Sequence, residues 1–236
     1  MSSTTLSSSN FRLILDALDD YTNQTGADLT QNPFADKPHS CPTSDAVLEL
    51  LNDRAKQFKE YREGNRKLIN WLSPIVKVVH AFSDILREVV SSLPFQPAKV
   101  IFVGVDVLLA AASSVSASYD TLVDLFECIG SFLKRLNIYT KIPFPSPMID
   151  IIVKIMVEVL AVLALATTQI KNGRLKKFAK KLLGEGDIEA VLQRLDRLTQ
   201  EEARMTVAQT LEVVHGLVNN VKVVMDGAQA FLQHRF

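Results

Sequence analysis

The chain has 236 residues, 47% of them hydrophobic, and its 26 basic and 26 acidic residues give a formal net charge of zero. This length suits one large helical domain or two small ones with a sizeable core. A balanced charge excludes long-range steering toward nucleic acid, and two distant cysteines, Cys41 and Cys128, argue against a disulfide framework and suit a reducing compartment.

The first part of the chain predicts a short amphipathic helix between two irregular segments. Residues 1–9 are rich in serine and threonine, lack the pattern of a secretory signal, and are predicted to be disordered. Helical spacing of Phe11, Ile14 and Leu18 predicts a helix through about Tyr21. Glycine and prolines from residue 25 to residue 42 predict an ordered loop.

A long helix is predicted from an N-cap at Ser44 to about Leu93, before two prolines. Its apolar positions recur in steps of three and four, and we expect a kink at Pro74 or a break near Gly64.

The segment 97–138 is predicted to form the centre of the protein. Residues 100–118 are apolar on all sides and carry one charge, Asp106, so they need cover from neighbouring helices or from lipid. Asp106 would cost about 2.5–3.5 kcal/mol near the middle of a bilayer, which disfavours insertion. We expect its carboxylate to pair inside the bundle with a lysine such as Lys154 or with backbone donors.

Three further helices are predicted downstream, with breaks between them. Residues 119–137 form an amphipathic helix, and a helix capped by Ser146 runs to about Ile170. After the glycines near residue 185, Asp187 caps a last helix of about 40 residues, or about 60 Å at 1.5 Å per residue. Its apolar positions are Ile188, Val191, Leu195, Leu198, Met205, Ala208, Leu211, Val214, Val218, Val221, Met225 and Ala228. Such a seam requires a long partner, either the helix from Ser44 or another chain.

These patterns predict an all-α protein, an elongated bundle of long antiparallel helices around a central buried apolar helix. The predicted organisation is a disordered stretch over 1–9, a helical bundle over 10–183, and a long C-terminal helix over 184–236. That last helix either packs on the bundle or leads to a downstream module.

The sequence offers no pattern typical of an enzyme or a cofactor-binding protein. The four histidines and the cysteines lack the spacing of metal ligands, and no glycine-rich phosphate loop with a following lysine is present. The serines cluster at the start of the chain or on predicted helices, away from the strained turn of a nucleophile. We therefore expect no catalytic residues, no cofactor and no metal.

A lysine-rich amphipathic segment is the strongest local feature. Its apolar residues occupy the other helical face, as in helices that lie on anionic lipid, where each cation contributes about 1 kcal/mol. An ordinary surface helix with solvated lysines is the favoured interpretation, and lipid contact stays open. Nucleic acid is not expected as a partner, because no aromatic platform accompanies the cations. The candidate lipid contacts are Lys171, Arg174, Lys176, Lys177, Lys180 and Lys181.

Several stretches resemble one family, the fungal STAND N-terminal Goodbye domain. They are residues 16–30 (DALDDYTNQTGADLT), 32–36 (NPFAD), 68–72 (LINWL), 98–109 (AKVIFVGVDVLL) and 118–126 (SYDTLVDLF). The resemblance covers about residues 10 to 140 and consists of packing and turn motifs.

The resemblance implies a non-enzymatic signalling or effector module at the N-terminus of a fungal NLR-like receptor, ahead of a nucleotide-binding module and repeats. Such a module acts by self-association, in programmed cell death or a response to non-self. A more distant similarity links it to HeLo-like bundles that disturb membranes. The chain departs from these because its first helix carries Asp16, Asp19 and Asp20 and is too short and acidic to insert alone.

Two functions are therefore carried forward. One is a cytoplasmic signalling module that binds itself or protein partners and contacts anionic membrane surfaces at the periphery. The alternative is a coiled-coil scaffold that gathers protein partners. A nucleotide-binding module is expected only in a full-length receptor, of which this chain would be a fragment, a truncated form or a separate effector.

Overall fold

The computed structural model describes residues 3–32, 43–58, 67–89, 97–115, 118–136, 146–173, 190–198, 200, 201 and 204. The chain divides into two compact units, Met1–Thr199 and Gln200–Phe236. Of the second unit, residues 200, 201 and 204 are described, and all three are helical. The division falls inside the C-terminal region predicted from residue 184 onward.

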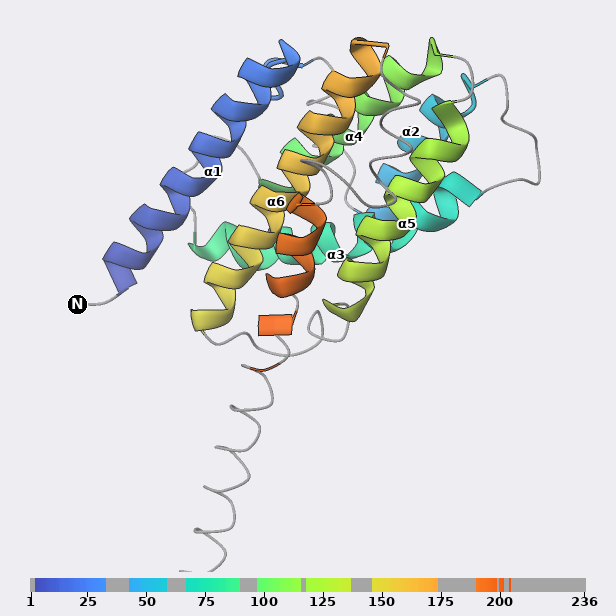
Figure 1. Cartoon of the computed structure of the whole chain (residues 1–236). Helices are drawn as coiled ribbons and strands as arrows, with labels where there is room; N and C mark the ends of the chain where they lie inside the picture. The colour runs from blue at the N-terminus through green and yellow to red at the C-terminus, as the bar shows by residue number, and fades with distance from the viewer. Residues whose placement is uncertain are drawn as a thin grey trace, which may run out of the picture. The chain divides into compact units, whose positions relative to one another are not determined.

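The first unit is an all-helical bundle, which confirms the predicted fold class (Figure 1). Residues 190–198 add a further helical segment, and in the described ranges no residue belongs to a strand. The labelled helices are α1 (Ser3–Thr25), α2 (Ser44–Ala55), α3 (Lys67–Val89), α4 (Pro97–Ser113), α5 (Ser118–Leu136) and α6 (Ser146–Lys171).

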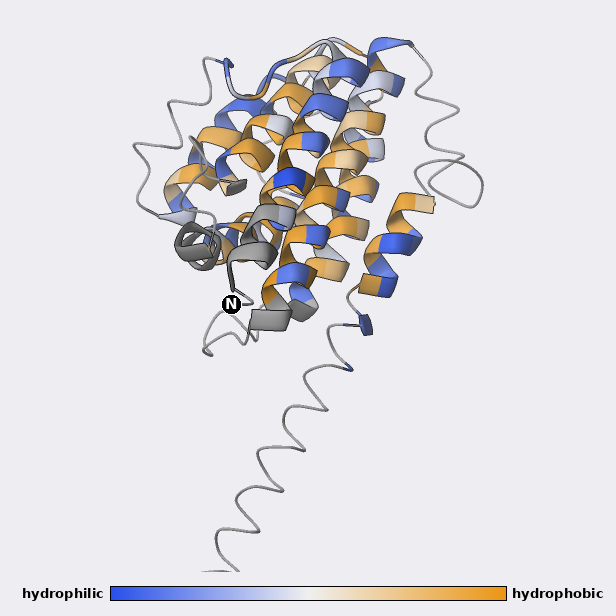
Figure 2. Cartoon of the chain, turned by 90° about the vertical axis from the view of Figure 1, so that its left-hand side faces the viewer, coloured by the Kyte–Doolittle hydropathy of each residue, from blue (hydrophilic) through white to orange (hydrophobic). Residues whose placement is uncertain are grey.

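Helix α4 is buried around most of its circumference, as its uniformly apolar sequence requires. It contacts α2, α3, α5 and α6, and the residues from Val100 to Asp106 are all buried. Gly104 allows α6 to come close, because a Cβ atom at this position would lie 3.2 Å from Leu163 Cδ1. Burial of each large aliphatic side chain stabilises the fold by about 1.5–3 kcal/mol. Figure 2 shows that apolar residues predominate along the helices of the bundle.

Helices α1 and α6 lie side by side and run parallel to each other (Figure 1). Near their N-terminal ends, Asn10 Nδ2 donates to Asp150 Oδ1 over 2.7 Å. Near their C-terminal ends, Thr168 Oγ1 donates to the carbonyl oxygen of Gln24 over 2.9 Å. The predicted antiparallel arrangement therefore does not apply to this pair, since the long connection between α1 and α6 allows either direction.

The predicted long helix from Ser44 to Leu93 is wrong, because it is two helices. α2 ends at Ala55, and the amides of Gln57 and Phe58 turn back to the carbonyls of Arg54 and Ala55. This turn buries Phe58, whose ring meets the edge of Tyr119 with 5.8 Å between centroids. The break thus comes before Gly64, which lies outside the described residues.

Details at the helix ends and at Pro74 also differ from the predictions. The N-cap of α2 is Thr43, whose hydroxyl accepts the amide of Ala46, and Ser44 is the first helical residue. Helix α3 continues through Pro74. α1 begins at Ser3, within the stretch predicted to be disordered, since serine and threonine in a helix cost less than about 0.7 kcal/mol each relative to alanine.

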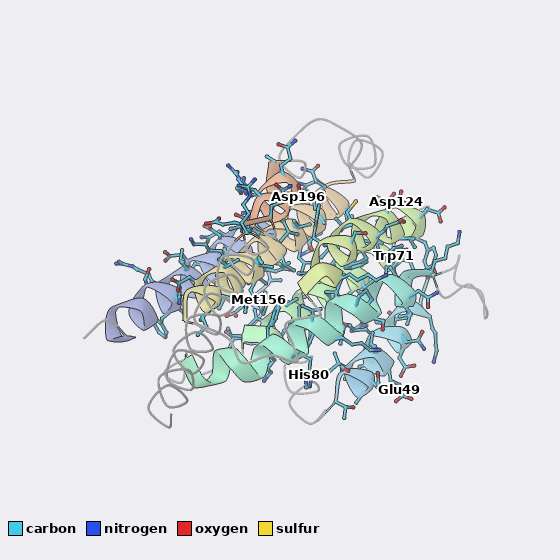
Figure 3. The ribbon with its side chains drawn as sticks, turned by 90° about the horizontal axis from the view of Figure 1, so that it is seen from below. Glu49, Trp71, His80, Asp124, Met156 and Asp196 are labelled. Carbon is cyan, nitrogen blue, oxygen red and sulfur yellow. The ribbon has the colours of Figure 1, made fainter. Side chains whose placement is uncertain are left out.

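Helix α3 lies between α2 and α5. Figure 3 places Glu49 on α2 and Asp124 on α5 on opposite sides of α3. Trp71 of α3 faces α5, where Gly130 permits a close approach, since a Cβ atom there would lie 3.2 Å from the Trp71 carbonyl oxygen. The acidic outer faces of α2 and α5 therefore point away from each other.

Candidate functional site

Of the six predicted lipid-contact residues, Lys171 is described, and it takes part in the fold. Its Nζ atom donates to the carbonyl oxygen of Thr25 at the end of α1 over 2.8 Å. The other five, Arg174, Lys176, Lys177, Lys180 and Lys181, lie outside the described residues. The lysine-rich segment thus begins beside the C-terminal end of α1.

The last carbonyl groups of α1 are satisfied by side chains of α6. The final carbonyl groups of a helix have no partner within the helix and carry the negative end of its dipole. Thr168 and Lys171 of α6 donate to Gln24 and Thr25, and the lysine also brings a favourable positive charge. The sequence shows the charge of Lys171, but it cannot show that the charge lies at the end of another helix.

The loop after α1 is held by its own short side chains, as predicted for an ordered loop. Gly26 has φ +68°, a conformation that favours glycine. The hydroxyl of Thr25 donates to the carbonyl of Tyr21 and accepts the amide of Ala27. Leu29 is buried, so the turn also adds a residue to the core.

Asp28 closes the turn that follows. Its Oδ1 atom accepts the hydroxyl and the amide of Thr30, at 2.6 Å and 2.8 Å, and the amide of Gln31. These hydrogen bonds, chiefly those from Thr30, hold the pKa of the Asp28 carboxyl below its usual range. The stretch 25–30, which belongs to the resemblance noted in the sequence, is therefore a structural turn at the end of α1.

A buried tyrosine lies between α1, α4 and α6. Tyr21 is 1% exposed, and its ring lies near Gly104. Burial raises the pKa of the Tyr21 hydroxyl to about 12, although the neighbouring Thr167 lowers it in part. The Thr167 hydroxyl donates to the carbonyl of Leu163, and the Tyr21 hydroxyl has no well-formed hydrogen bond within the described structure.

The charge inside α4 is paired, but with a different residue from the one predicted. Arg54 of α2 donates from Nε to Asp106 Oδ1 over 2.6 Å and from a terminal nitrogen to Oδ2 over 3.2 Å. The Asp106 side chain is 5% exposed and that of Arg54 is 30% exposed. Lys154, the predicted partner, is exposed on α6. An arginine fits this site better, because its planar group can meet both carboxylate oxygens.

A second ion pair joins α6 to the helical segment 190–198. Arg194 Nε donates to Glu158 Oε1 over 2.9 Å, while Glu158 Oε2 is buried without a hydrogen-bond partner in the described ranges. Val191 and Leu195 of the same segment are buried. The segment therefore contributes an apolar stripe to the first unit.

The described part of the chain brings its polar groups together at helix junctions. Within it, no group of three or more His, Cys, Asp or Glu side chains is placed to hold a metal ion. None of the helices described combines the length and apolar character needed to cross a membrane. The junctions set how the helices pack, and they leave the outer faces as the surfaces available for contact.

Comparison with known proteins identifies one family. The sequence model described as the fungal STAND N-terminal Goodbye domain matches residues 15–139, which is just over half of the chain. The match includes α2 to α5 and part of α1, whereas α6 lies beyond it even though α1 and α4 pack against α6. No curated protein and no solved structure matches the chain.

We predict that Tyr21→Phe leaves stability near pH 7 unchanged or raises it by about 1 kcal/mol, because it removes a buried hydroxyl that lacks a good partner. Above pH 10 the variant should resist alkaline unfolding better than the wild type. A folded-state pKa raised from 10.0 to about 12 contributes stability that is complete below pH 10 and is lost as the pH rises toward 12. The difference amounts to about 2 kcal/mol at 1.4 kcal/mol per pKa unit.

Urea unfolding of both proteins at pH 7 and at intervals from pH 9.5 to 11.5 measures this. Lysines titrate alike in both proteins, so the comparison isolates Tyr21. Equal losses of stability in the two proteins over this range would show that Tyr21 is not buried in its neutral form.

Proposed function

This chain belongs to the fungal STAND N-terminal Goodbye domain family, and from that premise we propose that it is a non-enzymatic signalling or effector module of an NLR-like receptor. It acts by self-association in the cytoplasm, in programmed cell death or a response to non-self. In a full-length receptor the nucleotide-binding module would lie in another part of the polypeptide. The module itself uses no cofactor, and its partners are other copies or other proteins.

The observation that carries this proposal is the family match over helices that form one bundle. Its buried polar groups are committed to holding helices together: Asp106 to Arg54, Asn10 to Asp150, and Thr168 to α1. The remaining charged side chains of α1, α2 and α5 are exposed, among them Asp16, Asp45 and Asp120. A module of this kind works through its surface, and clustering of copies is the simplest way to change what that surface presents.

The alternative is a structural scaffold that gathers protein partners. It is favoured by the apolar seam in the C-terminal part of the sequence. A scaffold and a signalling module both self-associate, but clustering of a scaffold alone has no effect on the host cell.

We predict that enforced clustering of this chain in a fungal host lowers colony formation tenfold or more. The chain is fused to a domain that dimerises on addition of a small molecule, and colonies are counted with and without that molecule. Leu108→Asp, which places a charge at a fully buried position of α4, is the control, because it should disrupt the bundle while leaving the fused dimerisation domain intact.

Death with the wild type alone supports a signalling role of the folded module. If clustering is verified by fluorescence and growth is unchanged, the signalling function is wrong and the scaffold is favoured. If Leu108→Asp is equally toxic, the effect comes from aggregation, which also contradicts the proposal.

Contact with anionic membrane surfaces is a second candidate function. The observation that favours it is the position of Lys171, which fixes the start of the lysine-rich segment at the common end of α1 and α6. Because Lys171 already donates to Thr25, we assign lipid contact mainly to the other five cations, Arg174, Lys176, Lys177, Lys180 and Lys181.

We predict that replacing Lys176, Lys177, Lys180 and Lys181 by glutamine reduces co-sedimentation with phosphatidylserine liposomes tenfold or more at physiological salt, since each cation contributes about 1 kcal/mol. The matched control replaces Lys67, Lys77, Lys134 and Lys154, four exposed lysines of α3, α5 and α6, and makes the same change in net charge. Equal loss in both variants, or no binding by the wild type, would contradict a lipid site in this segment.

A further inference from the structure

The C-terminal part of the sequence contains a strict heptad pattern. From Val207 to Leu232 every position at alternating steps of four and three is apolar. A pattern sustained over more than three heptads is typical of a coiled coil. These residues lie outside the described part of the chain, so the pattern is taken from the sequence. The positions are Val207, Leu211, Val214, Val218, Val221, Met225, Ala228 and Leu232.

The described helical residues just before this seam show that it does not extend the packing of the bundle. In the segment 190–198, Val191 and Leu195 are buried and Leu198 is half-buried. Val207 follows Leu198 by nine residues, which is about two and a half turns at 3.6 residues per turn. The seam is therefore about half a turn out of helical phase with the stripe that the first unit buries.

The positions that the seam would occupy upstream are exposed and mostly polar. Counted back in the same heptad from Val207, they are Arg204, Gln200, Arg197 and Gln193, and all four are exposed. The seam thus begins after Arg204, within the unit Gln200–Phe236 that is compact by itself. It needs a partner with the same 3.5-residue period, and an identical seam of another copy meets that requirement.

The composition of the seam indicates the number of copies. Valine occupies three of the four positions that correspond to d, and a β-branched residue at d favours trimers or tetramers over dimers. The adjacent g positions add Leu217, Val224 and Phe231. An apolar stripe of this width exceeds what a two-stranded coil can cover.

We propose that residues 207–232 form the self-association element of this protein, a coiled coil of three or more copies of the chain. The proposal rests on the self-association proposed above and names its surface and its partner. The coil lies apart from the apolar stripe of residues 191–198, so assembly does not require the bundle to open.

The test is the molecular mass of the full chain in solution by light scattering over a range of concentrations. The wild type should have three or more times the mass of one chain. The double variant Val214→Lys, Val221→Lys places charges at two d positions and should fall to the mass of one chain. Val213→Lys, Val223→Lys changes the same residue types on the outer positions of the same helix and should keep the oligomer.

A monomeric or dimeric wild type would overturn the proposal, as would equal masses for the two double variants. Near-ultraviolet circular dichroism and the unfolding midpoint check that the bundle is intact in both. The outcome is independent of the clustering experiment, because the fused dimerisation domain supplies association there: a broken seam with unchanged toxicity would overturn only the role of the seam in signalling.

Discussion

The pairing of Asp106 with Arg54 is the interaction on which the arrangement of the bundle depends. Helix α4 is apolar enough to be covered on all sides, and one carboxylate lies in its middle. Leaving that charge buried without a partner would cost several kcal/mol. Arg54 meets both carboxylate oxygens from the last turn of α2, so α2 can pack on α4 in one register. The turn that follows then buries Phe58 against Tyr119.

The other side of α4 is covered by α6, which in turn holds α1. This pair is tied at both ends by hydrogen bonds, from Asn10 to Asp150 and from α6 to the last carbonyls of α1. Because the family match ends at residue 139, the folded unit is larger than the matched region. Surfaces that remain for partners are the outer faces of the helices, which agrees with a module that signals by contact between copies.

The sequence predicts the helices of this protein well because their apolar spacing is regular. It fails at the end of α2, where Ala55 and Phe58 keep the same spacing through the turn and hide it. It also predicts that Asp106 is paired, since a buried charge must be, but not its partner, because Lys154 and Arg54 are both compatible with the pattern. The role of Lys171 was missed for the same reason: periodicity within one helix says nothing about the end of another.

The central claim is that a buried ion pair, rather than apolar packing alone, sets how α2 meets α4. The most direct measurement is the urea unfolding free energy of Arg54→Met, of Arg54→Met with Asp106→Leu, and of Lys56→Met, which breaks an exposed pair with Asp53. The single change at Arg54 should cost about 3 kcal/mol, and adding Asp106→Leu should restore most of it, since the unpaired charge is then gone. Lys56→Met should change stability by less than about 1 kcal/mol. If Arg54→Met is no more harmful than Lys56→Met, or if the double variant is no better than the single one, the claim is contradicted.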